Sequence, residues 1–201
     1  MYSSADSVQI TVRGVAAHDA SPHLGKDPVL MGSQIVVALQ SIITREISLM
    51  EPALITVGAF DGGTAPNVIA DHALLDITVR ANSEKTRYQL LDSIKRVALN
   101  TARASGVPED LLPLVTISED GAPTTTNDAA LSQRVRRAML AGMGEDAFVD
   151  WYQSDVGAED FPDLVNITPA IPSVYFEVGG TPPKQIETGT WASHHSPLFK
   201  N

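Results

Sequence analysis

The sequence predicts a two-part α/β protein: a ferredoxin-like β-α-β-β-α-β unit at residues 7–118 and a partial α/β segment at residues 119–201. Two observations predict it. Up to residue 118, strand and helix periodicities follow one another in the order strand, helix, strand, strand, helix, strand. After a Gly- and Pro-containing stretch at 121–127, helical and extended patterns alternate singly, which is typical of a parallel sheet. Residues 1–6 are expected to form an N-terminal extension.

The first strand and the first helix have clear local signals. Val8–Arg13 alternates apolar with polar side chains, the pattern of a half-buried strand. Asp27 is a suitable N-cap before Pro28 at the first helical position. Apolar residues then recur at helical spacing from Met31, so we expect a helix of about five turns that ends near Ile47.

Three further strands and a second helix complete the first unit. Ala53–Phe60 and Ala73–Arg80 read as strands on either side of a Gly-rich turn. Ser83 caps a helix that stops at the Gly106-Val107-Pro108 stretch, and Leu112–Ser118 is the fourth strand. The result is a four-stranded antiparallel sheet with two helices on one face and an open edge available for self-association.

The second unit is shorter in regular structure. We expect a helix from Asn127 or Asp128 to Leu140, a strand at Phe148–Trp151, a helix at Glu159–Leu164 and a strand at Ser173–Val178. Two short strands do not make a sheet on their own, so this part is expected to be incomplete.

Composition excludes several classes of function. The chain has 24 acidic and 14 basic residues, a net charge of −10, which repels phosphate backbones, so nucleic acid is not an expected partner. It has no cysteine and hence neither a disulfide nor a thiolate metal site, which fits a cytoplasmic protein. No leader pattern is visible, and no uninterrupted apolar run approaches about 20 residues, so we expect no membrane partner.

Taken on their own, the polar residues that stand out have ordinary as well as functional explanations. His18 lies in a loop, where a histidine is more often a surface residue than a catalyst. Asn67 follows a Gly-Gly-Thr-Ala-Pro stretch and would usually be a turn residue. Arg80 ends a strand, where most arginines are solvated, although a guanidinium aimed into a cleft binds a carboxylate through two hydrogen bonds.

A histidine pair, His194-His195, lies in an expected loop near the end of the sequence. A neutral imidazole there suits zinc. Adjacent histidines can hardly both reach one ion, however, and the chain contains no HxH, HxxxH or HExxH companion. Spacing alone therefore disfavours a metal site.

The unusual residues nevertheless occur in the order of a known family. The stretches Ser4–Gly14, Ala17–His23 and Asp27-Pro28 resemble the entry into the lid, or dimerisation, domain of M20 amidohydrolases of the hippurate hydrolase and N-acyl-amino-acid deacylase branch. Later motifs of that branch are similar to residues 62–69, 78–80, 157–161, 179–180 and 195–197. One such motif is weak, but the ordered set spans almost the whole chain and is specific.

The resemblance implies a hydrolase of N-acyl amino acids, with the lid inserted into a catalytic domain that holds two zinc or manganese ions and a homodimer formed through the lid. It implies that His18 reaches the partner subunit's active site and hydrogen-bonds the substrate carbonyl, stabilising the oxyanion. It assigns Asn67 and Arg80 to the substrate's amide or α-carboxylate. It also assigns Gly179 and Gly180 to the backbone lining of that pocket, and His195 to the metal.

The sequence departs from the family pattern in ways that bear on activity. Family members have a Cys-Gly-His-Asp-type motif and a paired-glutamate motif ahead of the lid, and this sequence contains neither. Asp19 stands where alanine usually follows the lid histidine, and Ala70 where proline is common. We therefore expect the 201 residues alone to be inactive and to hold no catalytic metal tightly. Two alternatives stay open: a stand-alone dimerisation or binding module, and a nonfunctional fragment of such an enzyme.

Overall fold

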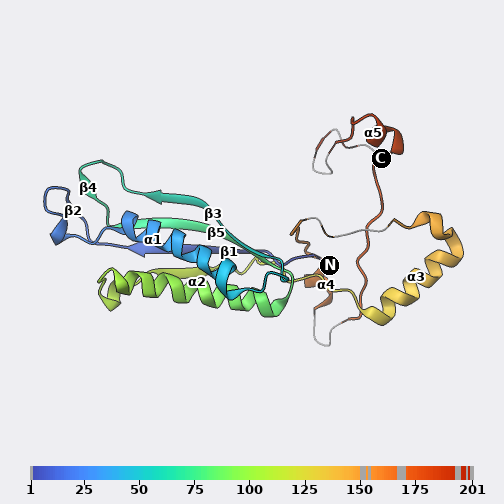
Figure 1. The fold of residues 1–201 in the computed structure, drawn as a ribbon, viewed down its shortest axis with the longest axis horizontal. Coiled ribbons are helices and arrows are strands. Elements are labelled where there is room, and N and C mark those ends of the chain that lie inside the picture. The colour runs from blue at the N-terminus through green and yellow to red at the C-terminus, as the bar shows by residue number, and fades with distance from the viewer. Residues whose placement is uncertain are drawn as a thin grey trace.

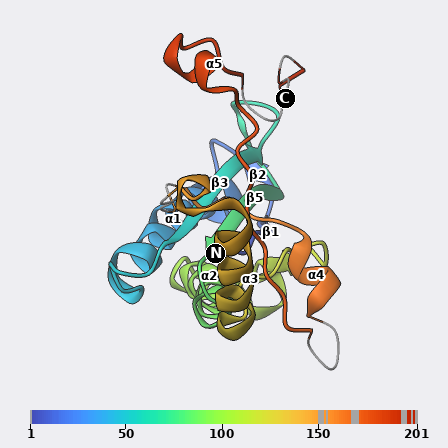
Figure 2. The same ribbon diagram turned by 90° about the vertical axis from the view of Figure 1, so that its right-hand side faces the viewer.

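The structure, a computed structural model, describes residues 2–149, 153, 155–166, 171–192, 196–197 and 199. Its main element is an antiparallel sheet in the order β3-β5-β1-β6. Helices α1 and α2 lie side by side against this sheet (Figures 1 and 2). The bounds are β1 (Asp6–Arg13), α1 (Pro28–Ser41), β3 (Ala53–Gly62), β5 (His72–Ala81), α2 (Glu84–Ala104) and β6 (Leu114–Ile117). The predicted ferredoxin-like order is confirmed, and we call residues 6–117 the lid.

Side-chain alternation explains which face of the sheet the helices cover. Val8, Ile10 and Val12 of β1 are at most 2% exposed, whereas the residues between them lie on the open face. The register continues this layer across the sheet, because Val8 pairs with Ile77 and Ile10 with Leu75, all buried. A slip of one residue would turn the whole apolar set to solvent, so the pattern fixes the register.

Both lid helices begin where the capping signals predict. The Asp27 carboxylate accepts hydrogen bonds from two backbone N–H groups in the first turn of α1. The Ser83 hydroxyl accepts from the backbone N–H of Thr86 at 3.2 Å in the first turn of α2. After α2, a 3-10 turn, η3 (Glu109–Leu111), leads into β6.

The first helix is apolar on two sides. With its π-helical extension η2 (Ile42–Glu46), it is long and apolar enough to cross a membrane by length and composition alone. Its inner face is nevertheless part of the core, with Ile35 and Leu39 fully buried. Its outer face carries Leu30 and Val37, which are 57% and 73% exposed. The described residues therefore cover only one of the two apolar faces.

Two short strands form the end of the lid that is farthest from the N-terminus (Figure 1). They are β2 (Ala17–His18) and β4 (Val68–Ile69), which pair antiparallel. A 3-10 turn, η1 (Pro22–Leu24), follows β2 on the way to α1. We call this end the tip and the opposite end, where β1 begins, the base.

The C-terminal part contains helices but, in the residues that the structure describes, no strand. Helix α3 confirms the predicted helix, with Asp128 as its N-cap. The strand predicted at Ser173–Val178 is wrong: the backbone has no strand assignment, because a strand needs a neighbour to pair with. The strand predicted at 148–151 is absent at its first two positions, and the other two lie outside the described residues. The bounds are α3 (Ala129–Met143), η4 (Glu145–Ala147), α4 (Phe161–Val165) and α5 (Pro183–Glu187).

Candidate functional site

The structure brings His18 and Asn67 together at the tip. Pairing of β2 with β4 sets His18 opposite Val68, and the backbone N–H of Asp19 donates to the carbonyl of Asn67 at 3.2 Å. The His18 side chain is 65% exposed. Its Nδ1 lies 2.7 Å from the Asp19 carboxylate and 3.1 Å from the backbone nitrogen of Ala20. Both contacts use Nδ1, so they orient the ring and leave Nε2 facing away from them.

A shallow hollow of about 630 Å³ lies beside this pair and is lined by Asp19 and the loop Gly62–Pro66, among other residues. Two glycines let this loop turn closely against its neighbours. Gly63 has a φ of 79°, which favours glycine, and a Cβ on Gly62 would lie 2.9 Å from that of Ala73. The tight turn sets the position of Asn67 directly after it.

Arg80 lies at the base, far from the tip. It is eight positions along β5 from His72, a span of about 26 Å at the usual rise per residue. It alternates with buried Val79 and Ala81 and so lies on the open face of the sheet. Its guanidinium donates to the carbonyl of Val156 at 2.8 Å. Within one chain the structure therefore does not bring Arg80 together with His18.

The other predicted residues belong to the C-terminal part. Gly179 is exposed, with no described atom beyond its two chain neighbours within 4 Å of an added Cβ, and Gly180 is partly buried. His195, the predicted metal ligand, lies outside the described residues. Among the residues described, no three His, Cys, Asp or Glu side chains meet in a group that would hold a metal ion. They do not by themselves fit the two ions that the resemblance implies, so we derive no chemical step through a metal.

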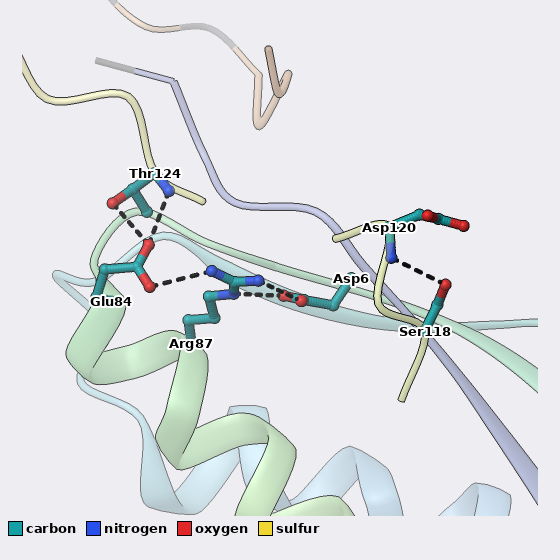
Figure 3. A network of polar contacts seen from close by, with 6 residues as sticks. All are labelled: Asp6, Glu84, Arg87, Ser118, Asp120 and Thr124. Carbon is teal, nitrogen blue, oxygen red and sulfur yellow. Dashed lines mark hydrogen bonds and ion pairs between the residues drawn. The ribbon is translucent and has the colours of Figure 1, made fainter. Parts of the chain in front are cut away.

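A buried ion-pair network at the base was not predicted from the sequence (Figure 3). The guanidinium of Arg87 binds both carboxylate oxygens of Asp6, at 2.7 and 2.9 Å, and reaches Glu84 at 3.1 Å. The side chains of Asp6 and Arg87 are only 1% and 11% exposed. Glu84 accepts from the backbone N–H and the hydroxyl of Thr124, at 2.8 and 3.0 Å. The network ties together the start of β1, the first turn of α2 and the segment after β6.

The network shifts the pKa values of two of its members. Burial alone would raise the pKa of Glu84, but the hydrogen bonds from Thr124 and the charge of Arg87 outweigh it and hold this pKa below its usual value. Hydrogen bonding to Asp6 raises the pKa of Arg87 despite its desolvation. The sequence did contain a signal: the alternation that turns Val8 inward also turns Asp6 inward, and a buried carboxylate requires a partner.

Acid should weaken the lid through Glu84. Its folded-state pKa lies below the ordinary 4.5, so its contribution to stability is complete above pH 4.5 and is lost as the pH falls through the folded value. Glu84→Gln should therefore flatten the decline of Tm between pH 6 and about pH 3, measured by thermal unfolding. Glu119→Gln, at an exposed carboxylate, is the control. Equal acid slopes in Glu84→Gln and the wild type would contradict this assignment.

These features define a class of architecture: a ferredoxin-like lid whose tip presents a histidine and whose base is joined to a second part of the chain. The family described as a peptidase dimerisation domain, of the M20 group, matches residues 3–105. The chain belongs to the M20 family.

Individual relatives agree with this assignment. The hippurate hydrolase of Campylobacter jejuni is 32% identical over 134 residues, which cover 65% of this chain and 35% of that protein. The IAA-amino acid hydrolase ILR1-like 2 of Arabidopsis thaliana is 30% identical over 192 residues, covering 96% of this chain and 41% of that protein. A crystal structure described as a "putative aminohydrolase" from methicillin-resistant Staphylococcus aureus has a TM-score of 0.72 and 27% identity, covering 81% of this chain and 40% of that one. The chain spans less than half the length of each.

Proposed function

We propose that this chain supplies the lid and the C-terminal part of an amidohydrolase that cleaves the amide bond of N-acyl amino acids. The observation that carries the proposal is the placement of His18 beside Asn67 at the tip of an M20 lid. The names of relatives support the substrate class. They include a hippurate hydrolase, an N-acetyl-L-cysteine deacetylase and an IAA-amino acid hydrolase, all names that point to an acylated amino acid.

The tip is suited to donating a hydrogen bond to a carbonyl oxygen. The backbone N–H of Ala20 donates only to an unprotonated Nδ1 of His18, which puts the proton of the neutral ring on Nε2. In a neutral ring the Asp19 carboxylate, 2.7 Å from the same Nδ1, instead favours a proton there and leaves Nε2 an acceptor. The donor that we propose is the Nε2–H of the tautomer that accepts from Ala20. Such a donor stabilises the negative charge that develops on an amide oxygen under attack.

We also propose that two lids complete each site. Because His18 and Arg80 lie at opposite ends of one lid, a single substrate meets both only if a second chain runs antiparallel to the first. A two-fold axis beside the sheet forms two equivalent sites, with the tip of each lid beside the base of the other. The active unit is then a homodimer.

The edge of β3 and the outer face of α1 are the surface that fits such a dimer. β3 is an edge strand of ten residues whose one charge is Asp61, whereas natural exposed edges are usually protected by charges. α1 packs along β3, with Gly32 so close to Phe60 that a Cβ would lie 2.8 Å from the ring. The exposed Leu30 and Val37 therefore lie on the helix next to the bare edge. The opposite edge, β6, offers only four residues.

We expect the wild-type chain to be a dimer, twice its 21.4 kDa, in light scattering at micromolar concentration. Val37→Glu should dissociate it, because the carboxylate would be desolvated in the interface. Leu114→Glu, at a 53% exposed position on the β6 edge, is the control and should leave the dimer intact. A wild-type monomer at high micromolar concentration would contradict the dimer, and dissociation by Leu114→Glu alone would move the interface to β6.

Arg80→Lys should weaken substrate binding in the assembled enzyme although the charge is kept. A lysine ammonium does not reproduce the planar pair of hydrogen bonds to a carboxylate, so KM should rise by about tenfold or more. Arg13→Lys is the matched control, since Arg13 also lies at or next to the end of a strand and donates to a backbone carbonyl, that of Leu112. Steady-state kinetics with an N-acyl amino acid make the test. Unchanged KM in Arg80→Lys would remove the proposed role.

One observation favours a second candidate function, a stand-alone dimerisation or binding module. All the hydrophobic core residues of the described chain lie between Val8 and Leu112, so the lid has a core of its own. Such a module would form the same dimer without hydrolysing anything. An assay of N-acyl-amino-acid hydrolysis separates the two functions when it is run on the dimer alone and on a chimera of this chain with a longer relative.

A further inference from the structure

Two segments join the lid to the rest of the described chain, and they are paired with each other. We call them the connectors: residues 2–5, before β1, and residues 121–125, after β6. Backbone hydrogen bonds run both ways between Tyr2 and Thr125, at 3.1 and 3.3 Å, and both ways between Ala5 and Ala122, at 2.9 Å. The Gly- and Pro-containing stretch that follows the first predicted unit therefore begins as part of a small antiparallel ladder.

The first turn of α2 binds the outgoing connector and the residue that follows the incoming one. Arg87 holds Asp6, directly after the incoming connector, and Glu84 holds Thr124 in the outgoing one (Figure 3). The fit is close, because a Cβ on Gly121 would lie 2.5 Å from a carboxylate oxygen of Asp6. No other charged pair in the described chain has both side chains less than about one-eighth exposed.

We infer that Arg87 is a positioning residue: through Asp6, next to the incoming connector, and through Glu84, which binds Thr124 of the outgoing one, it fixes both connectors to α2 as a clamp, so that lid and connectors form one rigid arm. Bending between the lid and the rest of the protein then occurs beyond the Tyr2–Thr125 pair, and not where the connectors join β1 and β6. A buried two-bond ion pair has this effect because its separation would leave both charges without solvent or partner.

The clamp also bears on Arg80 through backbone contacts. The incoming connector donates from Ser3 to the carbonyl of Gly157 at 2.8 Å, next to the Val156 carbonyl that accepts from Arg80. Holding the connector therefore holds the loop against which Arg80 rests. The clamp stands on the contacts alone, whereas its consequence for substrate binding rests on the proposed function.

Hydrogen exchange of the whole 201-residue chain tests the clamp without any assay of activity. In Arg87→Gln, amides of residues 2–5, 121–122 and 124–125 should exchange about tenfold faster or more, while those of β1 and β5 keep their protection. Arg87→Lys, which keeps one charged bond to Asp6, should restore part of the protection. Arg103→Gln is the matched control, because Arg103 also lies on α2 and makes a two-bond ion pair, with Glu109, but at an exposed position.

The same experiment contains its refutation. Equal exchange of the connectors in Arg87→Gln and Arg103→Gln would overturn the inference. If Arg87→Gln also accelerates amide exchange in β1 and β5, the test is repeated with the double variant Asp6→Asn/Arg87→Gln. This variant leaves no unpaired charge from the buried Asp6–Arg87 pair. Connector-only acceleration in the double variant supports the clamp, and any other pattern overturns it. Selective acceleration together with an unchanged KM for Arg80→Lys would remove the proposed role of Arg80 in substrate binding and leave the clamp standing.

Discussion

A chimera in which this chain replaces the matching region of the Arabidopsis thaliana IAA-amino acid hydrolase ILR1-like 2, a match over 96% of this chain, should hydrolyse an IAA-amino acid, whereas the 201 residues alone should show no measurable rate. A metal centre requires several ligands at about 2 Å, and no such group of side chains meets among the described residues. The chimera provides the part of the relative that this chain does not match. Metal content and hydrolysis, measured on both proteins, make the comparison.

His195→Ala should lower the activity of the chimera by at least about 100-fold, because changing even an outer-shell partner of a metal ligand costs 10- to 100-fold. His72→Ala is the control, since that histidine is exposed and its ring lies against the carboxylate of its exposed neighbour Asp71. Robust metal-dependent hydrolysis by the 201-residue chain alone would show that the chain holds a complete site. Full activity of His195→Ala would remove that residue from the site.

Mixing the His18→Ala and Arg80→Ala variants of the chimera should restore activity if each site combines the tip of one subunit with the base of the other. Every site in a His18→Ala dimer lacks its tip donor, and every site in an Arg80→Ala dimer lacks its base cation. Random exchange makes half of the dimers mixed, each with one intact and one doubly defective site, so activity should return to about a quarter of the wild-type value. Hydrolysis is measured before and after subunit exchange.

A mixture of His18→Ala with Asn67→Ala is the control for this exchange. Both residues lie at the tip, so every mixed dimer has one defect in each of its sites and activity should stay low. If His18 and Arg80 instead served one site within one chain, the first mixture would stay as inactive as its parents. That outcome would refute the antiparallel arrangement of the two lids.

The lid was predictable because its local signals agree with one another. Alternation fixes the faces of β1 and β5, and the Asp27 and Ser83 caps fix the starts of both helices. The strand predicted at Ser173–Val178 failed because its apolar pattern indicates a buried strand only where a second strand exists to pair with it. Local pattern does not carry that information.

The candidate site was predictable only residue by residue. The sequence singles out His18, Asn67 and Arg80, yet the distance between tip and base follows from the length of β5 and appears only in three dimensions. The Asp6–Arg87 pair was missed although Asp6 stands at a core position, because its partner lies far along the chain on α2. Sequence periodicity marks a buried charge but does not say which residue neutralises it.

The paired connectors have a consequence for how such a domain is acquired. Because residues 2–5 and 121–125 run side by side, the lid presents its host with two chain ends about 5 Å apart, the spacing of adjacent strands. A gene segment encoding it therefore fits into one surface loop of another domain without pulling that loop open, and the host loses little loop-closure entropy. Lid and host are then free to diverge at different rates, provided that Gly121 and the pair beneath it are kept.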